Sequence, residues 1–96
     1  MKRIIEKLRE LVREERYQIS VHANEEMAND LLMAIDVENT ILTGAITKKF
    51  TKDPRGVRYE VTSQACDDRS VTVICRIVPG NWLRIVTVFE LAEDKL

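Results

Sequence analysis

Four runs of alternating side chains between Ala45 and Leu91 constrain the fold of this 96-residue chain more than any other feature. In each run one set of alternate positions is mainly apolar, which is the period of a β-strand. Turn-forming segments separate the runs at 53–56 (Asp-Pro-Arg-Gly), 66–69 and 79–81 (Pro-Gly-Asn). Because connections this short can join only antiparallel neighbours, we predict a four-stranded antiparallel sheet whose strands follow sequence order.

The alternation also predicts which side chains face the core. The inward set comprises Val57, Tyr59, Val61, Val71, Val73, Cys75, Ile77, Leu83, Ile85, Thr87, Phe89 and Leu91. The alternate positions, Thr72 among them, would form an open face. In the first run Lys48 lies between Ile46 and Phe50, which is typical of an edge strand that carries an inward-pointing lysine.

Residues 1–44 are predicted to form a helical layer on one face of the sheet, so that the whole chain would be a single α+β domain. Residues 2–16 carry an apolar stripe of helical spacing made of Ile4, Ile5, Leu8, Leu11 and Val12. After a short extended link at Tyr17–Ile19, Ser20 is typical of a helix N-cap. It would begin a second helix that ends near Leu31.

The second helix would place Val21, Met27, Ala28 and Leu31 on its apolar side. Residues 32–35 would be a buried connection. Asp36 would then cap a third helix, which ends at Leu42 and is closed by Gly44.

Composition excludes several classes of protein. No run approaches the roughly 20 apolar residues of a membrane span, and the charged start of the chain is unlike a signal peptide. We therefore expect a cytoplasmic protein that makes no membrane contact. Cys66 and Cys75 lie nine positions apart, without zinc or redox spacing, so Cys66 would be a free thiol. With three glycines there is no nucleotide-binding loop, and we expect no metal and no cofactor.

Charge is unevenly distributed along the chain. Five carboxylates and no Lys or Arg lie between Arg16 and Lys48, whereas eight basic and four acidic residues lie from Lys48 to Arg84. This pattern predicts an acidic helical layer against a basic sheet. Chance and ordinary solvated faces would produce the same bias, and both interpretations stay open.

His22 is the only histidine, two positions after the predicted Ser20 cap. The positive end of a helix disfavours imidazolium, so a neutral ring that acts as a general base or acid fits this position. A histidine that only packs and bonds a backbone carbonyl fits it equally well.

Arg58, Arg76 and Arg84 fall on the open faces of three consecutive predicted strands. Clustered arginines can hold a phosphate and stabilise charge that develops on phosphorus. The alternative is a cross-strand lattice of ion pairs with Glu60 and Glu90, which share those faces.

Several short motifs also occur along the chain in a defined order and spacing. They are Ile19-Ser20-Val21-His22-Ala23, Met27, Ile35-Asp36-Val37-Glu38, Gly44-Ala45-Ile46, Gly56-Val57-Arg58-Tyr59 and Ile85-Val86-Thr87-Val88. In this order they resemble, over residues 19–90, a small prokaryotic family catalogued as domain of unknown function four-two-five-eight. Glu26 and Ala34 stand where that family usually has basic residues.

That family is similar to RelE-like toxins, including the BrnT and MqsR groups, which are ribonucleases with N-terminal helices on an antiparallel sheet. The resemblance implies a RelE-like fold and metal-independent cleavage of messenger RNA by one member of a toxin–antitoxin pair. It assigns catalytic roles to His22, Arg58, Tyr59, Arg76 and Thr87. We further predict that Arg84, Lys48 and Lys49 would contact the RNA. The expected partners of the protein are RNA and a small antitoxin protein.

A second hypothesis is a non-catalytic interaction module that pairs through its open face or a sheet edge, as a homodimer would. Both hypotheses are carried forward to the structure.

Overall fold

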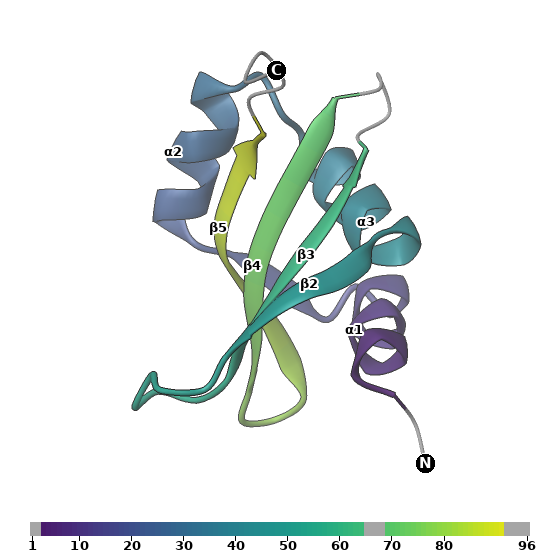
Figure 1. The fold of residues 1–96 in the computed structure, drawn as a ribbon, viewed down its shortest axis with the longest axis vertical. Coiled ribbons are helices and arrows are strands. Elements are labelled where there is room, and N and C mark those ends of the chain that lie inside the picture. The colour runs from purple at the N-terminus through teal and green to yellow at the C-terminus, as the bar shows by residue number, and fades with distance from the viewer. Residues whose placement is uncertain (1–2, 65–68, 92–96) are drawn as a thin grey trace.

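The computed structural model describes residues 3–64 and 69–91 and has an α+β fold with three helices and five strands (Figure 1). Cys66 and most of the predicted turn at 66–69 lie outside the described residues. The elements are α1 (Ile4–Arg13), β1 (Tyr17–Ile19), α2 (Val21–Asn29), α3 (Ala34–Thr43), β2 (Ala45–Phe50), β3 (Arg58–Gln64), β4 (Ser70–Val78) and β5 (Trp82–Glu90). None of the described helices is long and apolar enough to cross a membrane.

The sheet is mixed and has the strand order β1-β5-β4-β3-β2. The last four strands pair antiparallel in sequence order. The prediction of a four-stranded antiparallel sheet is nevertheless wrong, because β1 adds a fifth strand parallel to β5, with Tyr17 beside Leu83 and Ile19 beside Ile85. Three residues are too few to display a period of two, and their partner strand lies more than sixty residues along the chain, so no local pattern reveals this strand.

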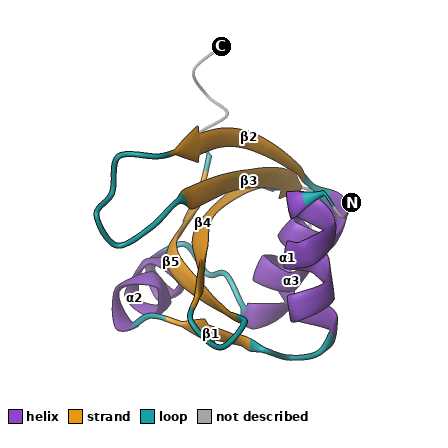
Figure 2. Cartoon of the chain, turned by 90° about the horizontal axis from the view of Figure 1, so that it is seen from below, coloured by secondary structure: helices purple, strands orange, loops and turns teal. Residues whose placement is uncertain are grey.

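Helices α1 and α3 cover one face of the sheet, and α2 lies on the other side of the molecule, alongside β5 (Figures 1 and 2). The predicted stripe on α1 buries Leu8, Leu11 and Val12, while Ile4 is exposed. On the same helix Arg9 donates hydrogen bonds to the carbonyls of Ile41 (3.1 Å) and Gly44 (2.9 Å). These bonds satisfy carbonyls at the C-terminal end of α3 that have no partner within the helix.

Ser20 caps α2 as predicted, because its Oγ accepts the N–H of Ala23 at 3.0 Å. The apolar side of α2 differs from the prediction: Ala23 and Met27 are buried, whereas Val21 and Leu31 are exposed. The helix ends at Asn29, and Leu31 adopts a left-handed backbone with φ 57°. This turn redirects the chain and leaves the Leu31 side chain in solvent.

Helix α3 begins at Ala34, two residues before the predicted cap at Asp36. Asp36 lies instead in the first helical turn and accepts the N–H of Met33 at 2.8 Å. The preceding segment is therefore not a buried connection: of residues 32–35 only Leu32 is buried.

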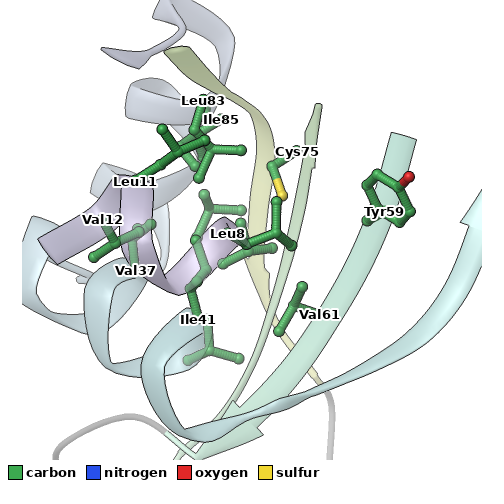
Figure 3. Packing of buried hydrophobic residues seen from close by; sticks show 14 of the residues in the cluster. Leu8, Leu11, Val12, Val37, Ile41, Tyr59, Val61, Cys75, Leu83 and Ile85 are labelled. Atoms are coloured by element: carbon green, nitrogen blue, oxygen red, sulfur yellow. The ribbon is translucent and has the colours of Figure 1, made fainter. Parts of the chain in front are cut away.

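One hydrophobic core lies between the sheet and the helices (Figure 3). Its members are Leu8, Leu11, Val12, Ala23, Met27, Leu32, Val37, Ile41, Tyr59, Val61, Val71, Val73, Cys75, Leu83, Ile85 and Val88. Burial raises the pKa of the Cys75 thiol to about 12, so this cysteine is a neutral packing residue at physiological pH.

Two irregularities in strand register change the predicted faces. Thr47 is an extra residue in β2, and Val86 is an extra residue in β5. A bulge of this kind reverses the faces of every later residue in its strand. As a result Lys48 pairs with Glu60, Thr87 with Ile74 and Phe89 with Thr72 on the outer face, which corrects the predicted inward positions of Lys48, Thr87 and Phe89.

The reversal also turns Val88 inward, where it is fully buried beside Val73. Thr72 on the outer face differs from the prediction in another way, because it is almost completely buried and its hydroxyl lies 3.2 Å from that of Thr62. The outer face is therefore not uniformly solvated.

The close contact between the end of α3 and β3 depends on Gly44. A Cβ atom at this position would lie 2.5 Å from the backbone oxygens of Thr40 and Thr62. We expect Gly44→Ala to lower the free energy of unfolding by about 1–3 kcal/mol, because backbone atoms must move apart. Chemical denaturation measures this loss, with Ala45→Ser at the exposed neighbouring position as the control. Equal stability of the two variants would contradict the close approach.

Candidate functional site

A row of five side chains crosses the face of the sheet that points away from α1 and α3. Phe50 pairs with Arg58, Arg76 pairs with Arg84, and Arg84 lies beside Gln18 of β1. The pairing of Tyr59 with Cys75 places Arg58 next to Arg76. We call Arg58, Arg76 and Arg84 the arginine row. The three predicted arginines thus lie on neighbouring strands, one strand spacing of about 4.8 Å apart.

The predicted lattice of Arg–Glu ion pairs does not form within the described part of the chain. Glu60 accepts a hydrogen bond from the Thr47 hydroxyl at 2.8 Å. Glu90 lies opposite Val71, beyond the bulge at Val86, and its carboxylate is 3.9 Å from Arg69. The bulge therefore turns Glu90 away from the arginines.

Arg76 and Arg84 face each other directly across β4 and β5. Among the described residues no carboxylate forms an ion pair or hydrogen bond with either of them. Like charges placed opposite one another destabilise an antiparallel pair. This arrangement therefore costs folding free energy and is suited to an anion that neutralises both side chains.

Arg58 is the member of the row with a carboxylate partner. Its Nε lies 3.2 Å from an oxygen of Asp53 in the loop that joins β2 to β3. Asp53 also accepts the backbone N–H of Arg55 at 2.9 Å and the Arg55 side-chain Nε at 3.2 Å. These bonds from Arg55, together with the charges of Arg55 and Arg58, hold the pKa of Asp53 below its usual 3.8.

A cavity of about 520 Å³ opens beside this loop. It is lined by Lys49, Phe50, Thr51, Lys52, Asp53, Pro54, Arg55 and Arg58. Four of these side chains are cationic and one is anionic, so the cavity extends the positive surface beyond the edge of the arginine row.

Aromatic rings lie at both ends of the arginine row, a feature that the sequence prediction missed. Phe50 contacts the guanidinium of Arg58 at 5.0 Å and the ammonium of Lys48 at 5.2 Å. Trp82 shares the face of Arg84, two residues away, and packs against Arg16 at 5.0 Å. Phe50 and Trp82 are both half-buried. Aromatic rings beside cations are the usual platform on which unpaired bases stack. The alternation in the sequence did not place Phe50 on the outer face, because the bulge at Thr47 reverses the faces of the residues that follow it.

His22 lies apart from this row. It is exposed on α2, and its Nε2 is 3.2 Å from a carboxylate oxygen of Glu26. The other Glu26 oxygen accepts the N–H of Val88 at 3.0 Å. Glu26 therefore has a structural task that a basic residue could not perform, and it also orients the imidazole.

The remaining predicted site residues are divided between the two faces of the sheet. Thr87 and Lys48 lie on the face of the arginine row. Tyr59 is buried on the opposite face, and Lys49 pairs with it at the exposed edge of the sheet. No hydrogen bond or ion pair of the described residues joins His22 or Tyr59 to the row.

The described residues contain no group of three or more His, Cys, Asp and Glu side chains that could hold a metal ion. Cations and aromatic rings thus share the outer face of the sheet, and a histidine–carboxylate pair stands on a helix alongside β5.

The model of one family, described as Domain of unknown function (DUF4258), matches residues 19–90. This span includes every strand of the sheet except the first two residues of β1, and it contains the complete arginine row and the His22–Glu26 pair. No curated protein and no solved structure matches the chain.

The geometry around Asp53 predicts a pH dependence. A carboxylate whose pKa is lowered on folding stabilises the fold above its ordinary pKa, and that contribution disappears as the pH falls through the lowered value. We expect the carboxyl carbon of Asp53 to titrate in NMR spectra with a midpoint below 3.8. Arg55→Ala should raise that midpoint toward the ordinary value, whereas Arg13→Ala on α1 should leave it unchanged. A wild-type midpoint at or above 3.8 would contradict the described hydrogen bonds.

Proposed function

The chain belongs to the DUF4258 family, and we propose that it binds RNA on the arginine row and cleaves it as a metal-independent endoribonuclease. The observation that carries the proposal is the direct pairing of Arg76 with Arg84, without a carboxylate partner among the described residues. A bound phosphate removes the repulsion that this pair imposes on the fold. Relief of this repulsion would contribute to the free energy of phosphate binding at this position.

Arginine suits the task because its planar guanidinium donates two parallel hydrogen bonds to phosphate oxygens. Arg76 and Arg84 are register partners on neighbouring strands, so we propose that their guanidinium groups contact one phosphate from two sides. In the cleavage step the same contacts would stabilise the extra negative charge that develops on phosphorus. No metal ion is required for that stabilisation.

His22 is the proposed acid or base. It is exposed, it stands in the first turn of α2, and Glu26 orients its ring at 3.2 Å. RNA that leaves the row at Arg84 and passes Thr87 along β5 travels toward α2, which packs beside β5. The geometry supports Arg76 and Arg84 as phosphate ligands, and Arg58, which is paired with Asp53, and Lys48 as further RNA contacts. The family resemblance, rather than the geometry, proposes a catalytic role for Tyr59.

The second candidate is an interaction module that does not cleave RNA. The position of His22 favours it, because none of the described hydrogen bonds or ion pairs links the imidazole to the arginine row. A sheet edge is a poor choice for the contact of such a module: β2 is interrupted by the bulge at Thr47 and carries Lys48 and Lys49, features that oppose strand pairing. The two candidates differ in whether RNA is bound and in whether it is cut.

We expect the affinity for a single-stranded RNA oligonucleotide to fall steeply with salt, because bound arginines displace counterions from phosphates. Arg76→Ala and Arg84→Ala should each flatten the plot of log affinity against log salt by about one unit. Arg13→Ala is the matched control, since it removes the same charge from the exposed side of α1. Fluorescence anisotropy at several salt concentrations measures all four proteins.

Cleavage is tested separately with the same oligonucleotide. Wild-type protein should cut it in the presence of EDTA, and His22→Ala should lose most of the cutting while it retains binding, because general acid–base catalysis contributes roughly 10²–10⁴-fold. Binding without cutting would favour the interaction module. Folded protein that fails to bind RNA at low salt would refute the proposed function.

A further inference from the structure

Three large apolar side chains project into solvent where α2 turns into α3. Leu31 is 80% exposed, Met33 67% and Ile35 52%. We call these three residues the α2–α3 knuckle. They occupy alternate positions between the turn that ends α2 and the first turn of α3, and Leu32, between Leu31 and Met33, is buried. The knuckle therefore belongs to a segment that is anchored by one residue and exposes its neighbours.

The backbone at Leu31 is an unusual choice for stability. Its φ of 57° lies in the left-handed region, which glycine and asparagine occupy easily and a bulky leucine does not. This conformation belongs to the turn that ends α2, in which the N–H of Leu31 donates to the carbonyl of Ala28 and that of Leu32 to the carbonyl of Met27. Glycine or asparagine would form the same turn without placing a large apolar side chain in solvent. The exposed leucine, rather than the turn, is therefore the feature that a contact outside the chain would explain.

Hydrogen bonds hold the knuckle in a fixed shape. Arg69 donates to the carbonyls of Asp30 at 2.6 Å and Leu31 at 3.0 Å. The N–H of Leu32 donates to the carbonyl of Met27 at 2.8 Å, and that of Met33 donates to the carboxylate of Asp36 at 2.8 Å. Because the segment is already ordered, binding a partner would cost little conformational entropy in this protein.

The charge around the knuckle selects the kind of partner. All five charged residues between Arg16 and Lys48 are carboxylates. Asp30 and Asp36 lie next to the knuckle in the chain and accept backbone N–H groups, Glu25 is exposed on α2, and Glu38 on α3 accepts a hydrogen bond from the Tyr17 hydroxyl. The neighbouring cation, Arg69, is engaged with the carbonyls at the end of α2. Two copies of this surface would bring like charges together, which disfavours a self-contact. A cationic partner is attracted to it.

We propose that the α2–α3 knuckle docks a basic amphipathic segment of another protein, with apolar side chains on the knuckle and lysines or arginines beside the carboxylates of α2 and α3. This site is separate from the arginine row, and it does not depend on RNA binding or cleavage. The partner is defined by its chemistry: an apolar stripe flanked by positive charge, the mode in which helices bind apolar surfaces.

The test uses two synthetic amphipathic helical peptides with the same leucine stripe, one with lysine and one with glutamate at the polar positions. Carbon–proton NMR spectra of the protein should show shifts of the Leu31, Met33 and Ile35 methyl groups on addition of the lysine peptide. The glutamate peptide should produce no such shifts at the same concentration, because its charge is repelled. Fluorescence anisotropy of labelled peptide supplies the dissociation constants.

Leu31→Gly is the decisive variant. Glycine relieves the left-handed strain, so the melting temperature should stay equal or rise, while the affinity for the lysine peptide should fall about tenfold or more, as expected for a central anchor. Val21→Gln is the matched control, because Val21 is an equally exposed apolar residue at the opposite end of α2. This control should bind the peptide like the wild-type protein.

Three results would overturn the proposal. Equal affinity of Leu31→Gly and wild type would show that the knuckle is not the docking surface. Equal affinity of the wild-type protein for the lysine and glutamate peptides would show that charge does not select the partner. A concentration-dependent dimer in analytical ultracentrifugation that disappears in Leu31→Gly would assign the surface to a second copy of this chain.

Discussion

The free edge of β5 is the constraint on which the arrangement of this protein depends. Strand β1 covers that edge only as far as Ile85, so the N–H groups farther along β5 need other acceptors. Glu26 accepts the N–H of Val88 and Asp30 that of Glu90, each at 3.0 Å. These two carboxylates thus accept the hydrogen bonds from β5 that the carbonyls of a neighbouring strand would otherwise accept. These bonds fix α2 alongside β5 and require acidic residues at position 26 of the helix and at its C-cap, Asp30.

This requirement separates the two signs of charge in space. Carboxylates gather on α2 because backbone N–H groups need them, whereas Lys48, Lys49, Arg58, Arg76 and Arg84 lie on β2 to β5. The acidic layer predicted from the sequence therefore has a specific structural cause at Glu26, Asp30 and Asp36, each of which accepts a backbone N–H. Within the described part of the chain no carboxylate forms an ion pair or hydrogen bond with Arg76 or Arg84, and the functional proposal rests on this difference.

The accuracy of the sequence prediction follows the position of the bulges. Arg58, Arg76 and Arg84 lie in stretches of regular alternation, so their common face could be predicted from a period of two. Thr87 and Glu90 follow the extra residue Val86, and the same rule fails for both. The side chains give no local signal for either bulge. The parallel strand β1 was also beyond prediction, because three residues paired with a distant strand leave no periodic pattern.

The bulge at Val86 also explains why the arginine row is not neutralised by its own strand. Without the extra residue, Glu90 would share the outer face with Arg84, and Val88 would turn outward with it. Val88 is fully buried beside Val73, and burial of a valine contributes about 1.5–3 kcal/mol. The register that places Val88 in the core is thus the register that removes Glu90 from the arginines. The inserted residue Val86 therefore both places Val88 in the core and keeps Glu90 off the outer face. In this way the candidate site is coupled to the stability of the fold.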